Sequence, residues 1–157
     1  MKKTNNKGFS LVELIIVIAI MAILIGVLAP QYIKYVEKSR VSADKDLIDS
    51  VYNALTTAYG DPDCTNTPSA GTYQLGTVAA ANGSRGDFTT LFMDTLGQGT
   101  TGNGSSVQAK LKSKIGKNSG GSSIQYVVDN NGNFTVYAGS TSGTIDEQYI
   151  AVGAGVN

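Results

Sequence analysis

The sequence predicts an α+β fold in which one long N-terminal helix packs on a small antiparallel sheet of three or four strands. Three observations support this prediction. Residues 9–29 form an apolar run, and residues 44–59 place apolar side chains at helical spacing. Only two of the 19 glycines precede residue 60. Beyond residue 120, short runs rich in β-branched and aromatic residues are separated by glycine-rich turns, which is typical of strands.

Composition limits the chemistry that the chain can perform. The 157 residues are enough for one modest domain with an appendage, and 12 basic side chains balance 12 acidic ones. The chain has no histidine, which is the commonest general base and metal ligand, and its single cysteine is Cys64. We therefore predict no catalytic residue, no metal site, no cofactor and no intrachain disulfide. The balanced charge gives no evidence of a specific nucleic-acid partner.

The apolar run from Phe9 to Ala29 has the length of a membrane span. Its 21 residues would rise about 31 Å as a helix, close to a bilayer core of about 30 Å. Three lysines precede the run and predict a cytoplasmic N-terminus, with the rest of the chain outside: Lys2, Lys3 and Lys7. The alternative is a conventional secretory signal cleaved after Val27-Leu28-Ala29. Against this alternative, the apolar run is longer than the apolar core of such a signal, which usually has about 7 to 15 residues.

Beyond the apolar run the pattern becomes amphipathic. The predicted apolar face contains Leu47, Ile48, Val51, Tyr52, Leu55, Ala58 and Tyr59. The predicted polar face contains Asp44, Lys45, Asp46, Asp49 and Asn53. Because Gly60 and Asp61-Pro62 form a stop signal, one long helix is expected from about Ser10 to Tyr59. Within it, Pro30 is either a kink or locally melted point, softened by Gly26, or a simple boundary between a membrane helix and a soluble helix.

The N-terminal residues resemble a known family. Lys7-Gly8-Phe9-Ser10-Leu11-Val12-Glu13-Leu14, with the apolar run that ends near Pro30, is similar to the N-terminus of type IV pilins and pseudopilins. The resemblance implies that a prepilin peptidase cleaves between Gly8 and Phe9, and that the new amine of Phe9 becomes methylated. Glu13 is then the fifth residue of the mature chain, where the family keeps a glutamate. The short leader is similar to those of the type IVa and pseudopilin subclass.

Glu13 is the only charged side chain in the apolar run. A charge at mid-membrane costs roughly 2.5 to 3.5 kcal/mol, so the carboxylate needs a compensating partner. The resemblance implies that this partner is the amine of a neighbouring subunit, which would set the register of a filament. The amine of its own chain is a second possible partner, and an interfacial position near lipid headgroups needs none. Small residues in the run would allow close helix approach: Ala19, Ala22, Gly26 and Ala29.

We divide the chain into four segments. Residues 1–8 are the leader peptide, and residues 9–30 are the transmembrane and filament-core half of the helix. Residues 31–60 are the amphipathic half, and residues 61–157 are a globular β domain with surface loops.

Within the β domain, strands are expected at Ile124–Asp129 and Phe134–Ala138, joined by a hairpin at Asn131-Gly132, and at Thr144–Val152. Asp87 is expected to cap a short helix ended by Gly97, with apolar residues Phe88, Leu91, Phe92 and Leu96. Another short helix is suggested by the fourfold spacing of Val107, Leu111 and Ile115. The stretches 61–72 and 97–106 are expected to be loops.

Three further patterns carry weak functional signals. Asp129, Asn131 and Asn133 alternate like the start of a calcium loop, but the twelfth position is Ser140 rather than Glu, which favours a hairpin turn. Four lysines form a basic patch that could touch DNA or another anionic surface, although a solvated helix face is the favoured interpretation: Lys110, Lys112, Lys114 and Lys117. Cys64 could pair between subunits, although an inert thiol is favoured.

The residues and the resemblance together predict a non-enzymatic structural subunit of a type IV pilus. The subunit is expected to be a single-pass plasma-membrane protein that then polymerises into an extracellular helical homopolymer, with Glu13, Gly26 and Pro30 as assembly residues. The implied partners are other copies of the chain, the prepilin peptidase, the inner-membrane assembly platform and membrane lipid. The alternative is a major pseudopilin of a type II secretion or competence (DNA uptake) system. A membrane-anchored binding module is less favoured.

Overall fold

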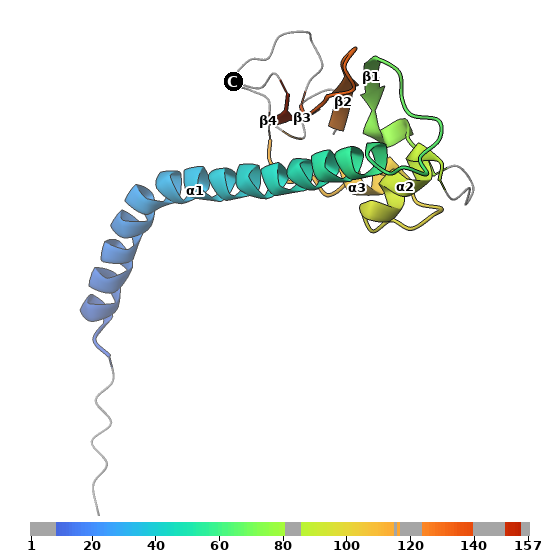
Figure 1. Cartoon of the computed structure of the whole chain (residues 1–157). Coiled ribbons are helices and arrows are strands. Elements are labelled where there is room, and N and C mark those ends of the chain that lie inside the picture. Colours follow the sequence, from blue (N-terminus) through green and yellow to red (C-terminus); the bar gives the residue numbers. More distant parts are fainter. Residues whose placement is uncertain (1–8, 81–85, 115, 117–123, 140–149, 155–157) are drawn as a thin grey trace, which may run out of the picture. The chain divides into compact units, whose positions relative to one another are not determined.

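The computed structural model describes residues 9–80, 86–114, 116, 124–139 and 150–154. Two compact units follow each other along the chain, Met1–Val36 and Glu37–Asn157. Helix α1, Leu11–Tyr59, contributes its first half to the first unit and its second half to the second (Figure 1). The predicted helix from about Ser10 to Tyr59 is therefore confirmed.

Pro30 lies inside α1 and does not end it. The residues on both sides of Pro30 are helical, so the prediction of a locally melted point is wrong. A proline in a helix interior removes one backbone hydrogen bond and costs about 3 kcal/mol in water. In a membrane helix this defect is tolerated, because neighbouring groups and small local adjustments satisfy the freed carbonyl.

The second unit contains a four-stranded antiparallel sheet in the order β1-β2-β3-β4. The strands are β1 Gly71–Gln74, β2 Ile124–Val128, β3 Phe134–Ala138 and β4 Ile150–Gly153. Strands β2 and β3 pair as predicted, with Tyr126 opposite Val136. The β1 strand pairs with the free side of β2, and β4 pairs with the free side of β3. The predicted α+β class with three or four strands is confirmed.

The turn between β2 and β3 is built around the Asp129 carboxylate. Asp129 Oδ1 accepts hydrogen bonds of 2.8 Å from the backbone nitrogens of Asn131 and Asn133. Its Oδ2 accepts a 2.8 Å bond from the Asn133 side-chain amide, and these Asn133 bonds lower the pKa of Asp129 below its usual value. Gly132 has a φ of 80°, which glycine adopts without strain. The predicted hairpin is confirmed, and its alternating polar residues serve the turn.

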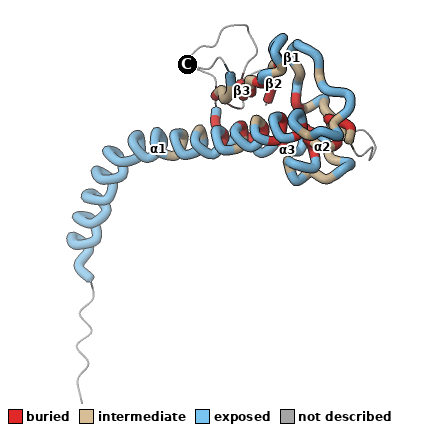
Figure 2. The backbone as a smooth tube through the Cα atoms, in the orientation of Figure 1, coloured by how far each residue is buried: buried red, intermediate tan, exposed pale blue. Residues whose placement is uncertain are grey.

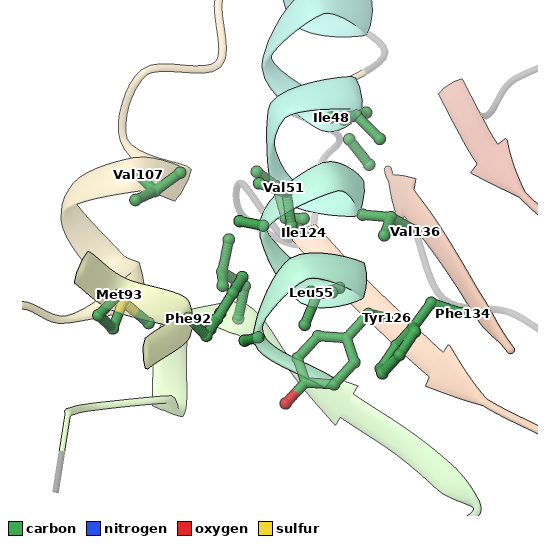
Figure 3. Close-up of a cluster of buried hydrophobic side chains, with 14 of the residues drawn as sticks. Ile48, Val51, Leu55, Phe92, Met93, Val107, Ile124, Tyr126, Phe134 and Val136 are labelled. Carbon is green, nitrogen blue, oxygen red and sulfur yellow. The ribbon is translucent and has the colours of Figure 1, made fainter. Parts of the chain in front are cut away.

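The core contains one face of the second half of α1. Ile48, Val51 and Leu55 are fully buried and recur at three- and four-residue spacing. Figure 3 shows them in one cluster with side chains from the sheet and the shorter helices: Phe92, Met93, Val107, Ile124, Tyr126, Phe134 and Val136. The predicted apolar face is confirmed at Ile48, Val51, Leu55 and Ala58, while Leu47 and Tyr52 are half-buried and Tyr59 is exposed.

Helix α2, Phe88–Thr95, begins where the sequence predicts. Asp87 Oδ1 accepts a 2.9 Å hydrogen bond from Thr89 N, and its Oδ2 accepts a 2.9 Å bond from the Asn66 side-chain amide. Burial alone would raise the pKa of Asp87, but the bonds from Thr89 and Asn66 lower the pKa below its usual value. Gly97 follows the helix with a φ of 70°, so the predicted cap and stop are both confirmed.

Two loop predictions are wrong at their ends. Strand β1 begins at Gly71, within the expected 61–72 loop, because its backbone pairs with β2 in the sheet. Helix α3, Gly104–Gln108, begins within the expected 97–106 loop, where the Asn103 side chain accepts a hydrogen bond from Ser106 N.

The helix expected through Val107, Leu111 and Ile115 is too long, since α3 ends at Gln108. Leu111 is nevertheless buried, and Ile115 lies outside the described residues. The expected strand at 144–152 is seen only as β4 from Ile150, because residues 144–149 also lie outside them.

The prediction that Asp44 lies on the polar face of the helix is wrong. Its side chain is 1% exposed, because three hydrogen-bond donors from a distant loop surround the carboxylate.

Candidate membrane and assembly segment

The apolar half of α1 is exposed along its whole length (Figure 2). Phe9 is 84% exposed, and the large apolar side chains from Leu11 to Leu28 are between 47% and 71% exposed. Soluble monomers rarely expose a contiguous apolar surface of more than a few hundred Å². The segment therefore requires an apolar partner, either lipid or other apolar helices.

The same segment has the length and composition of a membrane-spanning helix. From Leu11 to Ala29 the helix rises about 28 Å, close to the thickness of a bilayer core. No residue of its most apolar stretch is buried within the described part of the chain, which distinguishes it from the core helix of a soluble protein. Helical hydrogen bonding also satisfies its backbone, as a hydrocarbon environment demands.

The N-terminus of α1 is capped by a hydrogen bond between Ser10 and Glu13. The Ser10 backbone nitrogen donates to Glu13 Oε2 at 2.9 Å. In return, the Ser10 carbonyl accepts from Glu13 N at 3.1 Å and from Leu14 N at 3.3 Å. Ser10 thus occupies the N-cap position, and Glu13, the third helical residue, accepts from its backbone amide as in one half of a capping box. The carboxylate also lies at the positive end of the helix dipole.

This capping geometry is a role of Glu13 that the sequence interpretation missed. The pattern Ser-x-x-Glu before an apolar run is itself a signal for a helix N-terminus, and it could have been found at Ser10. The bond matters because the first N–H groups of any helix have no partner within it. In an apolar environment without water, Glu13 supplies an acceptor for one of these groups.

Of the other predicted processing and assembly residues, the structure describes Phe9, Gly26 and Pro30. Gly8 lies outside the described residues, whereas Phe9 is described and exposed. A Cβ atom built on Gly26 would have no atom of the described chain within 4 Å apart from its local helix. Packing within the chain therefore does not require glycine there, and Pro30 follows four residues later in the same helix.

The remaining candidates lie in the second unit. Cys64 is half-buried, and burial raises the pKa of its thiol, with smaller contributions from the charges of Asp61 and Asp87. A raised pKa disfavours the reactive thiolate. Among the residues that the structure describes, no three carboxylate, thiol or imidazole side chains gather in a way that could hold a metal ion.

Comparison with known proteins agrees with the geometry of the helix. Residues 3–29 match the family model described as the prokaryotic N-terminal methylation motif. Over 82% of its length, the chain is 29% identical to the type IV major fimbrial protein FimA of Dichelobacter nodosus, covering 79% of that protein.

Two further proteins match the chain over shorter stretches. The chain is 36% identical to the type IV major pilin protein PilA of Myxococcus xanthus over 38% of this chain and 27% of that protein. It is 41% identical to the fimbrial protein EcpC of Eikenella corrodens over 39% of this chain and 40% of that protein. No solved structure matches the chain. The chain thus carries the methylation motif at the start of an exposed apolar helix, and it is similar to structural fimbrial and pilin subunits, which supports a type IV pilin.

Proposed function

We propose that the chain is the structural subunit of a type IV pilus, released by prepilin peptidase and polymerised into an extracellular filament. Cleavage falls between Gly8 and Phe9, and the new amine of Phe9 is methylated. The observation that carries the proposal is an apolar half-helix, exposed from end to end, which continues into a folded α+β unit. The major fimbrial and pilin proteins among the relatives support it.

Before assembly the subunit is a single-pass protein of the plasma membrane. Residues 9–30 span the bilayer, the leader 1–8 lies in the cytoplasm, and residues 31–60 and 61–157 lie outside. Lysines before the span, and none within it, support this orientation. The inner-membrane assembly platform then withdraws the helix from lipid, and other copies of the chain replace the lipid around it.

Glu13 selects the register between subunits. Its capping bond uses Oε2, and Oε1 accepts no hydrogen bond from the described residues, so this oxygen can receive the amine of a neighbouring Phe9. Removing one partner of a buried ion pair costs about 3 to 5 kcal/mol, because the other charge is left alone. A subunit stacked out of register would bear that cost, and the pairing therefore favours one arrangement.

Gly26 and Pro30 shape the helix for packing in the filament. The space above Gly26 is open in the single chain, so a helix of another copy can approach its backbone closely. Pro30 frees a carbonyl from helical hydrogen bonding at the end of the apolar segment, where the helix must leave lipid and enter a protein environment.

Substitution of Glu13 tests this proposal. We expect the Glu13→Ala protein to be cleaved by prepilin peptidase, since the junction is unchanged, and to yield few filaments in material sheared from the cell surface. The control is Glu13→Gln, which retains an acceptor for the Ser10 amide but lacks the charge, and we expect the same loss of filaments. Wild-type filament yield from both variants would refute the pairing of Glu13 with a neighbouring amine. Absence of the wild-type chain from sheared filaments would favour a membrane-anchored binding module. Wild-type protein that is cleaved but stays in the cell envelope, without reaching sheared filaments, would favour a pseudopilin.

A further inference from the structure

Two carboxylates on α1 hold the loop that follows α3. Asp44 Oδ1 accepts a 2.8 Å hydrogen bond from Lys112 N, and Asp44 Oδ2 accepts bonds from Ser113 N at 2.8 Å and Ser113 Oγ at 2.6 Å. Glu37 Oε1 accepts a 2.6 Å bond from Lys114 N. Because Glu37 and Asp44 are seven residues apart, they lie on the same face of α1. Three successive backbone amides of the loop are thus fixed to one helix.

The loop is also closed on itself around Asp44. Gly116 N donates to Ser113 Oγ at 2.9 Å. A Cβ atom at Gly116 would lie 2.6 Å from Asp44 Oδ2, so glycine permits this close approach. With its amides bound and its end packed on the carboxylate, the loop has a defined backbone conformation.

That conformation turns alternate side chains outwards. Leu111 and Ser113 are buried, whereas Lys110, Lys112 and Lys114 are exposed. We call these three lysines the lysine strip; Lys117, the fourth lysine of the predicted patch, lies outside the described residues. The two acids that bind the loop are already engaged, because Asp44 accepts three hydrogen bonds and Glu37 also pairs with Arg40 at 3.7 Å. In the part of the chain that the structure describes, no ion pair neutralises the strip.

We propose that the lysine strip binds anionic lipid headgroups on the outer face of the plasma membrane before the subunit is assembled. This inference rests on the proposed membrane anchoring. Glu37 follows Ala29, the last residue of the apolar run, by eight positions, and eight residues reach no more than about 28 Å even when fully extended. The strip is therefore tethered to the surface that it would contact, which raises its effective concentration there.

Charge and proximity together select lipid over other anions. Each lysine near an anionic surface strengthens binding by about fivefold, and three on one fixed backbone act together. Duplex DNA carries similar charge, but nothing in the chain tethers it near the strip. Lipid contact would hold the folded unit near the membrane, and neighbouring subunits would release it on assembly.

Lysine acetylation measured by mass spectrometry tests this contact residue by residue. The full chain is inserted in nanodiscs of neutral phosphatidylcholine, or of the same lipid with about 30% phosphatidylglycerol. In the anionic discs we expect acetylation of the strip to slow by about threefold or more, and about 0.5 M salt should restore the rate. Lys45, which is exposed on α1 outside the strip, should change less.

Charge reversal provides the matched control. Lys112→Glu combined with Lys114→Glu should abolish the protection of Lys110 in anionic discs, whereas Lys45→Glu should leave it in place. Equal acetylation rates in neutral and anionic discs would overturn the proposal. So would protection by added duplex DNA in neutral discs without protection by phosphatidylglycerol, which would assign the strip to nucleic acid. Failure of the chain to remain in the discs after an alkaline wash would instead refute the membrane anchoring itself.

Discussion

Replacing Asp44 with alanine should destabilise the folded unit by about 3 to 5 kcal/mol. The carboxylate is 1% exposed and is the acceptor for three donors, of which Ser113 N and Ser113 Oγ are fully buried. Each buried donor left without an acceptor costs about 1 to 3 kcal/mol. Two such donors at about 1.5 to 2.5 kcal/mol each give the expected total, and the part-buried Lys112 amide can turn to water.

The assay is urea unfolding of the full chain in detergent micelles, followed by near-ultraviolet circular dichroism of the tyrosines. The matched control is Asp49→Ala, which removes an exposed carboxylate from the same helix and should change the free energy of unfolding by less than about 0.5 kcal/mol. Glu37→Ala should fall between the two, since its bond to Lys114 N is exposed. Equal stability of the Asp44 and Asp49 variants would refute the reasoning that the buried carboxylate organises the loop.

Three further predictions concern local structure. Gly132→Ala should lower the free energy of unfolding by about 1 to 2 kcal/mol, because φ is 80° and the new Cβ would lie 2.6 Å from Tyr59 Oη. The control Gly97→Ala, with φ of 70° and open space around the new Cβ, should lower it by about 1 kcal/mol. Equal losses in the two variants would exclude a contribution from Tyr59. Asp87→Ala should cost about 1 to 2 kcal/mol at neutral pH. Folding lowers the pKa of Asp87 from 3.8, so its contribution to stability should be complete above about pH 4 and decline as pH falls through the folded pKa. A difference in unfolding free energy between wild type and variant that stays constant in acid would contradict this assignment. Glu13→Ala should speed hydrogen exchange of the N-cap amide in micelles by about fivefold, whereas Glu13→Gln should retain protection, and equal exchange in the two variants would exclude the capping bond.

The sequence predicted the fold best where local chemistry decides the structure. Asp87 begins α2 because a carboxylate before a helix can accept from its first amides, and Asn131-Gly132 forms a hairpin because its backbone suits a tight turn. Strand β1 was missed because its four residues are mostly exposed and carry no alternating pattern. Its pairing with β2 depends on residues more than fifty positions away.

The misplacement of Asp44 has a different cause. Helical periodicity predicts which residues share a face, but it treats every carboxylate as a solvent-facing group. Asp44 is buried because Lys112 and Ser113, which follow it by 68 and 69 residues, donate hydrogen bonds to its carboxylate. The sequence around Asp44 does not predict these distant donors. The same contacts explain why the lysine strip belongs to a loop rather than to the helix face that the spacing suggested.

The sequence predicted a helix of membrane-spanning length at residues 9–29, but it did not predict the hydrogen bond in the first turn of this helix. The apolar run and the resemblance at Gly8 and Phe9 predicted a membrane and assembly helix. The charge of Glu13 predicted an ion pair only, whereas the structure adds a local role, in which the carboxylate accepts a hydrogen bond from the Ser10 amide. A cap within the chain and an ion pair between chains are compatible, because the carboxylate has two oxygens.

The central claim is that the chain is processed at the start of its apolar helix and then assembled. The most direct test is mass spectrometry of the N-terminal peptide from filaments sheared off the cell surface. We expect a chain that begins at Phe9 with a methylated amine. A chain that retains Met1 in those filaments would contradict it.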